Sequence, residues 1–303
     1  MVTVLAALEF IRRHEASDKP YFAVVWFGSP HGPHTAVEED RSLYDGQPEN
    51  LQHFYGEITG MDRAFGKLRE AIRSLPSYTN TVLWYCSDNG GLPGVGSTGG
   101  RGKKGDIYEG GLRVPAIIEW PAGIKEPGNT SMPANTSDIF PTLLDITGID
   151  LADDRPMDGI SLLPVFEHKM GHRYKPMGFW HYPAGGIRTP SIAWMAELLE
   201  AQQNGDMVGD SAKLRLDDIL IPDQYPIDTL AGHAAWLDWP WKLHRIQDKE
   251  GRVTWELYQL EKDSMETADL YSLEAEKALE MKAGLEDWQG SVVQSMYGGD
   301  YGK

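Results

Sequence analysis

Three short segments of the sequence carry residue types that could bind an anionic ester and help to hydrolyse it. They are a proline-flanked pair of histidines at residues 30–34, an acid–amide pair at residues 88–89 and a basic glycine-rich run at residues 99–105. Asp88 and Asn89 offer oxygen ligands of the kind that a hard divalent cation prefers. Lys104 offers positive charge to an anionic group, and His31 offers a proton to a leaving oxygen.

Each segment also has a purely structural interpretation. Asp-Asn-Gly-Gly is an ordinary turn sequence, histidines between prolines are compatible with a rigid loop, and glycine-rich runs with lysines are often solvated loops. The single cysteine, Cys86, stands in an apolar run and is expected to be a buried strand residue. A role in chemistry is favoured by position, because the segments lie at or just beyond the ends of predicted strands, where open α/β sheets bind ligands.

Hydrophobic periodicity predicts the elements that position these segments. The predicted elements are helices over residues 3–15 and 51–75, strands over 21–27, 81–86 and 114–121, and a helix between an Asp138 N-cap and a Gly148 stop. Nearly continuous apolar runs are typical of strands buried on both faces, as in a parallel sheet between helix layers. The alternation of helix and strand predicts an α/β fold whose layered sheet carries helices on both faces.

The periodicity changes after about residue 165, which predicts three parts of the chain. These are an α/β domain at 1–165, an irregular insertion near the pocket at 166–230 with a helix at 191–203, and an α+β subdomain at 231–303. The subdomain is predicted to hold a hairpin, with strands at 241–246 and 254–258, and a last helix at 273–293.

Charge and composition exclude several classes of function. With 28 basic and 45 acidic residues, the chain has a net charge of -17 and is a poor candidate for coating nucleic acid or an anionic membrane. No apolar run reaches the roughly 18 residues that a membrane helix needs. The lone cysteine excludes an internal disulfide. The apolar first residues are followed at once by charged residues, the reverse of a signal peptide, so the location stays undetermined.

The three segments, taken in order with the runs around them, resemble the sulfatase family of the alkaline phosphatase superfamily. The resemblance extends over residues 20–164 and is carried by residues 27–33, 61–62, 80–90, 104–115, 137–144 and 158–164. Residues 241–243 and 256–258 also resemble the family's C-terminal subdomain, and the overall likeness is to bacterial arylsulfatase-like proteins. The resemblance implies a partial alkaline-phosphatase-like fold, with a mixed sheet between helices and a smaller C-terminal sheet.

The resemblance also implies a role for each candidate site residue. Asp88 and Asn89 match the second pair of ligands of the active-site calcium. Lys104 matches the lysine that contacts the sulfate group, and His31 matches the histidine that contacts the sulfate and protonates the leaving oxygen. His34 stands where some relatives have a residue that faces the substrate. The implied substrate is a small molecule or saccharide that carries a sulfate ester, with a carbohydrate sulfate preferred.

The sequence departs from the family at the nucleophile. Family members use a formylglycine made from the first residue of Cys/Ser-x-Pro/Ala-x-Arg, and these 303 residues contain no such motif. The run that begins at Ser74 comes nearest but has Tyr78 in place of the arginine. The first pair of calcium ligands is missing as well. We therefore expect an incomplete calcium site, exposed apolar strand faces, and no hydrolysis unless the missing N-terminal half supplies the nucleophile. That half is either encoded separately or lost through a truncated gene model or a frameshift.

Two other functions remain open from the sequence. A phosphoester or phosphonate hydrolase of the same superfamily would share the fold and use a related metal site. A non-catalytic module would keep His31 and Lys104 as an anion pocket and bind a sulfated glycan without a nucleophile. Substrate preference separates the first from a sulfatase, and calorimetry with sulfated saccharides tests the second.

Overall fold

The structure of this chain is a computed structural model that describes residues 2–17, 19–96, 99–151, 155–181, 197, 200, 204 and 230–300. The chain divides into two units: the first comprises Met1–Leu151, Met157–Lys175 and Leu260–Thr267, and the second comprises Ala152–Pro156, Pro176–Gln259 and Ala268–Lys303. The three-part division predicted from the sequence stays a prediction. Most of its predicted helix at 191–203 lies outside the described residues.

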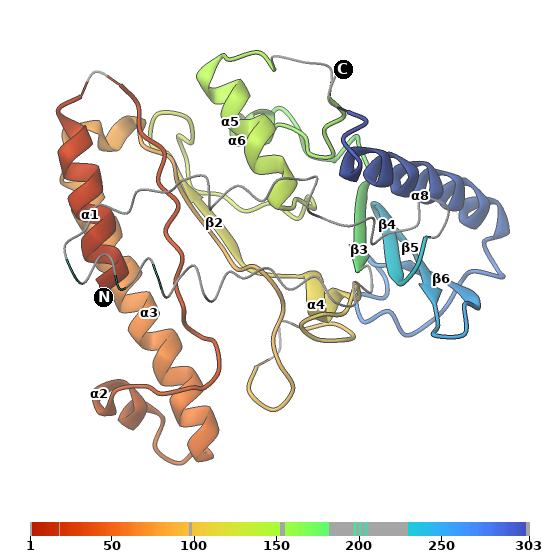
Figure 1. The fold of residues 1–303 in the computed structure, drawn as a ribbon, viewed down its shortest axis with the longest axis horizontal. Helices are drawn as coiled ribbons and strands as arrows, with labels where there is room; N and C mark the ends of the chain where they lie inside the picture. The colour runs from red at the N-terminus through yellow and green to blue at the C-terminus, as the bar shows by residue number, and fades with distance from the viewer. Residues whose placement is uncertain are drawn as a thin grey trace. The chain divides into compact units, whose positions relative to one another are not determined.

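Two long helices form one hydrophobic core of the first unit. Helix α1 (Val2–Glu15) lies along α3 (Glu49–Arg73), as Figure 1 shows in red and orange. The apolar residues of the two helices recur every three or four positions, so each helix turns one stripe toward the other. The buried residues of this contact are Val4, Leu8, Ile11, Ala64, Leu68 and Ile72. Both helices predicted from the sequence are confirmed.

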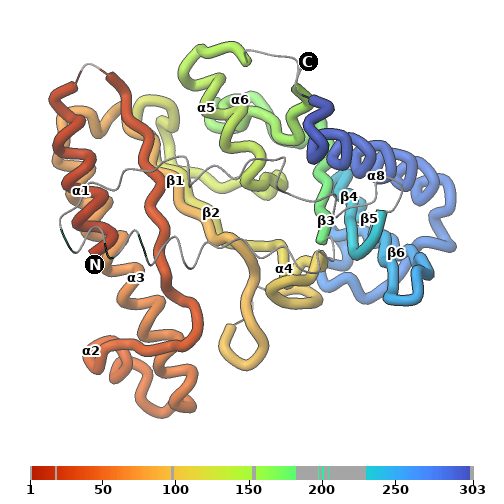
Figure 2. The backbone as a smooth tube through the Cα atoms, in the orientation of Figure 1, coloured from red at the N-terminus to blue at the C-terminus, as the bar shows by residue number. Residues whose placement is uncertain are grey.

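The strands of the first unit pair differently from the prediction. Strand β1 (Leu83–Cys86) lies beside strand β2 (Ala116–Glu119) (Figure 2). The two run antiparallel, with Leu83 opposite Glu119 and Cys86 opposite Ala116. A parallel sheet, suggested by the apolar runs, does not describe this pair, whereas the mixed sheet implied by the family resemblance can contain an antiparallel pair. Burial on both faces was also wrong, since β1 is half-buried throughout and Ile117 of β2 is 66% exposed.

The apolar run at residues 21–27 is extended but is not assigned as a strand among the described residues. Tyr21 and Phe27 pack against the α1–α3 core. Phe22, Val24 and Trp26 are exposed, Trp26 by 83%. The predicted strand buried on both faces is therefore corrected to a segment with one covered and one open side. The segment exposes apolar side chains, although it is not one of the strands for which exposure was expected.

The remaining elements of the first unit are short. They are α2 (Glu38–Arg41), η1 (Ser42–Tyr44), η2 (Pro76–Asn80), α4 (Glu109–Leu112), η3 (Thr136–Asp138), α5 (Ile139–Thr147) and α6 (Leu163–Phe166). Helix α5 ends at Gly148 as predicted, because that residue adopts a left-handed conformation with a φ of 67°.

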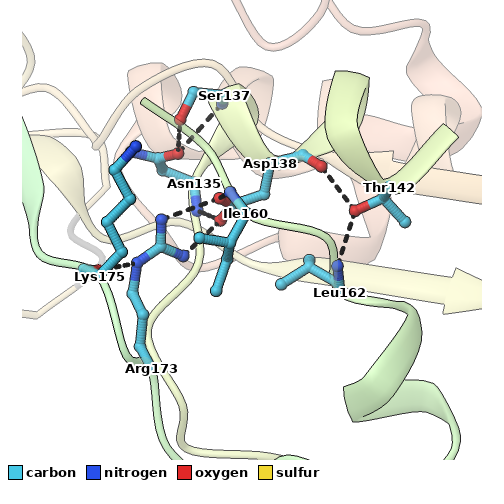
Figure 3. A network of polar contacts seen from close by, with 8 residues as sticks. All are labelled: Asn135, Ser137, Asp138, Thr142, Ile160, Leu162, Arg173 and Lys175. Atoms are coloured by element: carbon cyan, nitrogen blue, oxygen red, sulfur yellow. Dashed lines mark hydrogen bonds and ion pairs between the residues drawn. The ribbon is translucent and has the colours of Figure 1, made fainter. Parts of the chain in front are cut away.

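Asp138 has a larger role than the predicted N-cap of α5. Its side chain makes no cap hydrogen bond to α5, and the cap of the preceding turn η3 is Asn135. The Asp138 carboxylate instead accepts hydrogen bonds from the Ile160 N–H at 2.8 Å and from the two terminal nitrogens of Arg173 at 2.8 and 2.9 Å (Figure 3). Both side chains of this ion pair are at most 2% exposed.

A second carboxylate ties β2 to α3 and makes stability depend on pH. Glu119 accepts hydrogen bonds from Arg69 and from the Tyr78 hydroxyl, and Arg73 lies 3.6 Å from it. The hydrogen bond from Arg69, aided by Tyr78 and Arg73, lowers the pKa of Glu119 below its ordinary 4.5. A lowered pKa in the folded state contributes stability above the ordinary pKa, and this is lost as pH falls through the folded value.

We predict that Arg69→Met destabilises the protein at pH 7 and has a progressively smaller effect below about pH 4.5. The physical reason is that protonated Glu119 carries no charge, so its ion pair with the Arg69 guanidinium no longer contributes to stability. Urea unfolding of wild type and variant from pH 7 to pH 3 measures the difference. A destabilisation that stays constant over this range would contradict the role given to Glu119.

The described part of the second unit is an antiparallel sheet with a long helix packed on it. The strands are β3 (Met177–His181), β4 (His233–Asp238), β5 (Trp241–Gln247) and β6 (Val253–Gln259), in that order, and the helix is α8 (Ala275–Met296). Helix α8 packs on the sheet through Ala278 and Met281, which join the fully buried Leu243 and Leu257. The predicted hairpin and last helix are both confirmed.

The described residues therefore form a mixed α/β fold with small sheets, which is the coarse form of the predicted fold class. Among the described helices, none combines the length and the apolar character needed to cross a membrane.

Candidate functional site

The predicted acid–amide pair lies in the turn that follows β1. The Asn89 side-chain amide donates a hydrogen bond to Asp88 Oδ2, so the two side chains lie together. Gly90 is buried directly after them, and its N–H donates to the Gly111 carbonyl at 2.9 Å. An added Cβ on Gly90 would lie 1.9 Å from the Gly110 carbonyl oxygen. Glycine is required at position 90 because another backbone passes directly over it.

The loop that carries Lys104 is joined to the same turn. The Lys104 N–H donates to the Gly91 carbonyl at 2.9 Å, and the Gly110 N–H donates to the Arg101 carbonyl at 2.6 Å. Gly111 leaves no room for a side chain, since an added Cβ would lie 2.1 Å from the Asp106 carbonyl oxygen. The structure therefore brings the Asp88–Asn89 turn and the Lys104 loop together through backbone hydrogen bonds.

A buried carboxylate that sequence reasoning missed anchors this loop. Glu266 is 1% exposed, and its Oε2 accepts the Glu109 N–H at 2.7 Å. Arg101 donates to the Glu266 carbonyl at 3.3 Å and stacks over the Tyr108 ring at 4.0 Å. Because Glu266 follows Glu109 by 157 positions, no local pattern could have pointed to this contact.

Helix α3 holds the segment with the two predicted histidines. His34 Nδ1 donates to Glu57 Oε2 at 3.0 Å, and the Thr35 N–H donates to the other oxygen of Glu57 at 2.7 Å. His34 is 15% exposed, whereas His31 is exposed and its Nδ1 donates to the Gly32 carbonyl at 2.9 Å. Sequence reasoning also missed Glu57. A signal was available, because Glu57 and His53 stand four residues apart on one helix face, and His53 accepts the Ala36 N–H.

His34 and the Lys104 loop approach a common region of the first unit. The His34 ring packs against Phe54, with centroids 5.2 Å apart. Phe54 in turn packs on Gly96, where an added Cβ would lie 2.8 Å from Phe54 Cζ. Gly96 belongs to the same loop as Gly91, the hydrogen-bond partner of Lys104. The described contacts thus connect the three predicted segments, the first of them through His34. The hydrogen bond given for the His31 side chain among the described residues is to its neighbour Gly32.

The residues present do not complete a calcium site. Calcium takes about six to eight oxygen ligands, and Asp88 with Asn89 supplies only a few. Within the ranges that the structure describes, no three or more His, Cys, Asp or Glu side chains gather in a metal-binding group. The described donor set thus fits part of a calcium site at most, and the ligand roles of Asp88 and Asn89 stay predictions.

Cys86 is poorly suited to act as a nucleophile. Burial raises the pKa of its thiol, and the negative charge of Asp88 raises it further. At neutral pH the thiol is therefore protonated, whereas the thiolate is the reactive form. Cys86 is the last residue of β1, so the expected strand position is confirmed, but the residue is half-buried and not buried as expected.

The first half of the chain matches a known protein family. Residues 2–149 match the Sulfatase family. The chain is 31% identical over 200 residues to Arylsulfatase H of Homo sapiens, covering 62% of this chain and 34% of that protein. It is 26% identical over 181 residues to Endo-4-O-sulfatase of Bacteroides thetaiotaomicron, covering 53% and 35%.

A solved structure resembles almost the whole chain in fold. The crystal structure of Ps i-CgsB in complex with k-i-k-neocarrahexaose has a TM-score of 0.73 at 22% identity, and the match covers 96% of this chain and 54% of that chain. The chain spans about a third of the length of the curated relatives and about half of this structure. Residues 2–149 therefore match the sulfatase family in sequence. The curated relatives that align with about half of the chain are sulfatases.

Proposed function

We propose that the protein takes part in the calcium-dependent hydrolysis of a sulfate ester on a carbohydrate. Lys104 binds the sulfate group, and His31 donates a proton to the leaving oxygen as the sulfur–oxygen bond breaks. Asp88 and Asn89 supply part of the calcium ligands, and His34 faces the substrate. The nucleophile comes from a formylglycine segment outside these 303 residues, which contain no Cys/Ser-x-Pro/Ala-x-Arg motif.

One structural observation carries this proposal. The turn of Asp88 and Asn89 is tied to the Lys104 loop by the hydrogen bonds Gly90 N–H to Gly111 O and Lys104 N–H to Gly91 O, inside the family match. The residues proposed as calcium ligands and the lysine proposed to bind the sulfate therefore belong to loops joined by backbone hydrogen bonds. The carbohydrate preference is supported by the names of two similar proteins, an Endo-4-O-sulfatase and a structure that contains a neocarrahexaose.

We predict that the 303-residue chain with calcium releases no sulfate from 4-methylumbelliferyl sulfate. Co-expression with a segment that carries the formylglycine motif should restore release, because the scaffold then gains its nucleophile. In the restored protein, Lys104→Ala should lower kcat/KM by about a hundredfold or more, as for the loss of one charge-stabilising donor. Lys67→Ala, which removes an exposed lysine of α3, serves as the control.

Two results would count against this function. Turnover by the 303 residues alone would show that no outside nucleophile is needed. A higher kcat/KM for the matching phosphate monoester than for the sulfate ester would assign the protein to phosphoester hydrolysis instead.

A further inference from the structure

A cavity of about 400 Å³ opens beside the Lys104 loop. Its walls are the first half of α3, the run at residues 91–96, and residues 102, 103 and 110 of the loop. Tyr55 and Leu51 supply an apolar wall, and Lys103 supplies a cation. The volume is within the usual range for small-molecule sites, which combine apolar walls with a few polar groups.

Tyr55 is held in place by its neighbours. Its ring lies 5.3 Å from the Tyr44 ring and 5.7 Å from the Phe54 ring, measured between centroids. The Tyr44 hydroxyl is hydrogen-bonded to Thr59 Oγ1 at 2.6 Å, which fixes this cluster against α3. An aromatic ring at a cavity wall offers a flat apolar surface to a ligand. Because the ring is already held in place, binding costs it little conformational entropy. Such a face suits the C–H side of a sugar ring.

Lys103 is available to bind an anion. Its side chain is exposed, and neither Lys103 nor Lys104 makes an ion pair among the described residues. The Asp106 carboxylate of the same loop accepts the Lys103 backbone N–H at 3.0 Å. Lys103 lines the cavity and Lys104 follows it in the loop, although Lys104 is not among the residues that line the cavity. Two cations at neighbouring positions that lack ion pairs within the described ranges favour a ligand with more than one negative charge.

We propose that the Tyr55–Lys103 cavity holds the sugar ring of a sulfated saccharide, and that Lys103 binds a second anionic group on that saccharide. This inference rests on the proposed function, in which Lys104 binds the sulfate to be removed. The second group is a carboxylate or another sulfate, both of which offer oxygen acceptors to an ammonium. The favoured substrate is then a saccharide with at least two negative charges.

Calorimetry with the full chain and calcium tests the assignment. The probes are inorganic sulfate, N-acetylglucosamine 6-sulfate, a monosulfated disaccharide with a uronate, and a disulfated disaccharide without one. The two disaccharides distinguish a carboxylate from a sulfate as the second group. We expect Lys103→Ala to weaken binding of one or both disaccharides by about three- to tenfold and to leave N-acetylglucosamine 6-sulfate unchanged. Lys103→Arg should retain the binding, and Lys67→Ala, the matched control, should change nothing.

The aromatic wall gives a second readout. Tyr55→Ala should weaken all three saccharides by about three- to tenfold and leave inorganic sulfate unchanged, because the ion has no sugar ring. Three results would each overturn the assignment. The Lys103 and Lys67 replacements could change saccharide affinity equally, or Tyr55→Ala could leave it unchanged. The third is that wild type gives no heat with disaccharide at about 10 mM, on the order of the weakest useful affinity. The proposed function is tested separately, by sulfate release from the restored protein. If that protein releases sulfate but Lys103→Ala does not change disaccharide affinity, only this inference is overturned.

Discussion

Replacing Arg173 by methionine should lower the free energy of unfolding by about 3–5 kcal/mol, the largest stability loss that we expect from a single side chain. The guanidinium pairs with both oxygens of Asp138, and the two side chains are 2% and 0% exposed. Without Arg173 the carboxylate stays buried with two backbone N–H donors and no counter-charge. Removing one partner of a buried pair therefore costs much more than the pair itself contributes.

Urea unfolding of wild type and Arg173→Met measures this loss. Arg173→Lys should fall between them, because it keeps the charge and loses the two-pronged geometry. The control is Arg252→Met, which breaks the pair between Arg252 and Asp248, where the arginine side chain is 76% exposed and a small effect is expected. Equal stabilities of the Arg173 and Arg252 variants would contradict the role of the buried pair.

Replacing Gly90 by alanine should open the connection between the Asp88–Asn89 turn and the Lys104 loop. The new methyl group would lie 1.9 Å from the Gly110 carbonyl oxygen, and backbone on both sides must move to admit it. The φ of Gly90 is not in the left-handed region, so the expected effect comes from the collision alone. We expect a loss of about 1–3 kcal/mol in stability and faster exchange of the Lys104 amide hydrogen.

Hydrogen exchange and urea unfolding measure the two effects of Gly90→Ala. Gly66→Ala is the matched control, because Gly66 lies within α3 and an added Cβ meets nothing within 4 Å. Alanine favours the helix over glycine, so the control should gain about 0.5–1 kcal/mol. Unchanged protection of the Lys104 amide in Gly90→Ala would show that the two loops are not coupled. Under the proposed function, Gly90→Ala should also weaken sulfate binding.

The anchoring of the Lys104 loop has a consequence for the proposed site. The loop contains several glycines in left-handed conformations and would have many accessible shapes on its own. Glu266 limits these shapes by accepting the Glu109 N–H and by contacting Arg101 through its backbone. A buried acid therefore positions a basic loop without pairing with either of its lysines.

The sequence by itself determined the elements whose signal is local. Helices α1, α3, α5 and α8 and the hairpin β5–β6 were predicted because amphipathic periodicity and stop residues such as Gly148 act within a few turns of chain. The candidate residues Asp88, Asn89 and Lys104 could be selected in the same way, from short motifs. Their functional roles remain proposals that rest on the family match of residues 2–149.

Only the tertiary structure decided which distant groups meet. Sequence reasoning assigned Asp138 to a helix cap, whereas its carboxylate pairs with Arg173, 35 residues away. Glu57 holds His34 from 23 residues away, and Glu266 reaches the loop at Glu109 across 157 residues. The antiparallel pairing of β1 with β2 also escaped prediction. Such contacts depend on which surfaces the fold brings together, and a buried carboxylate looks the same in sequence whatever its partner is.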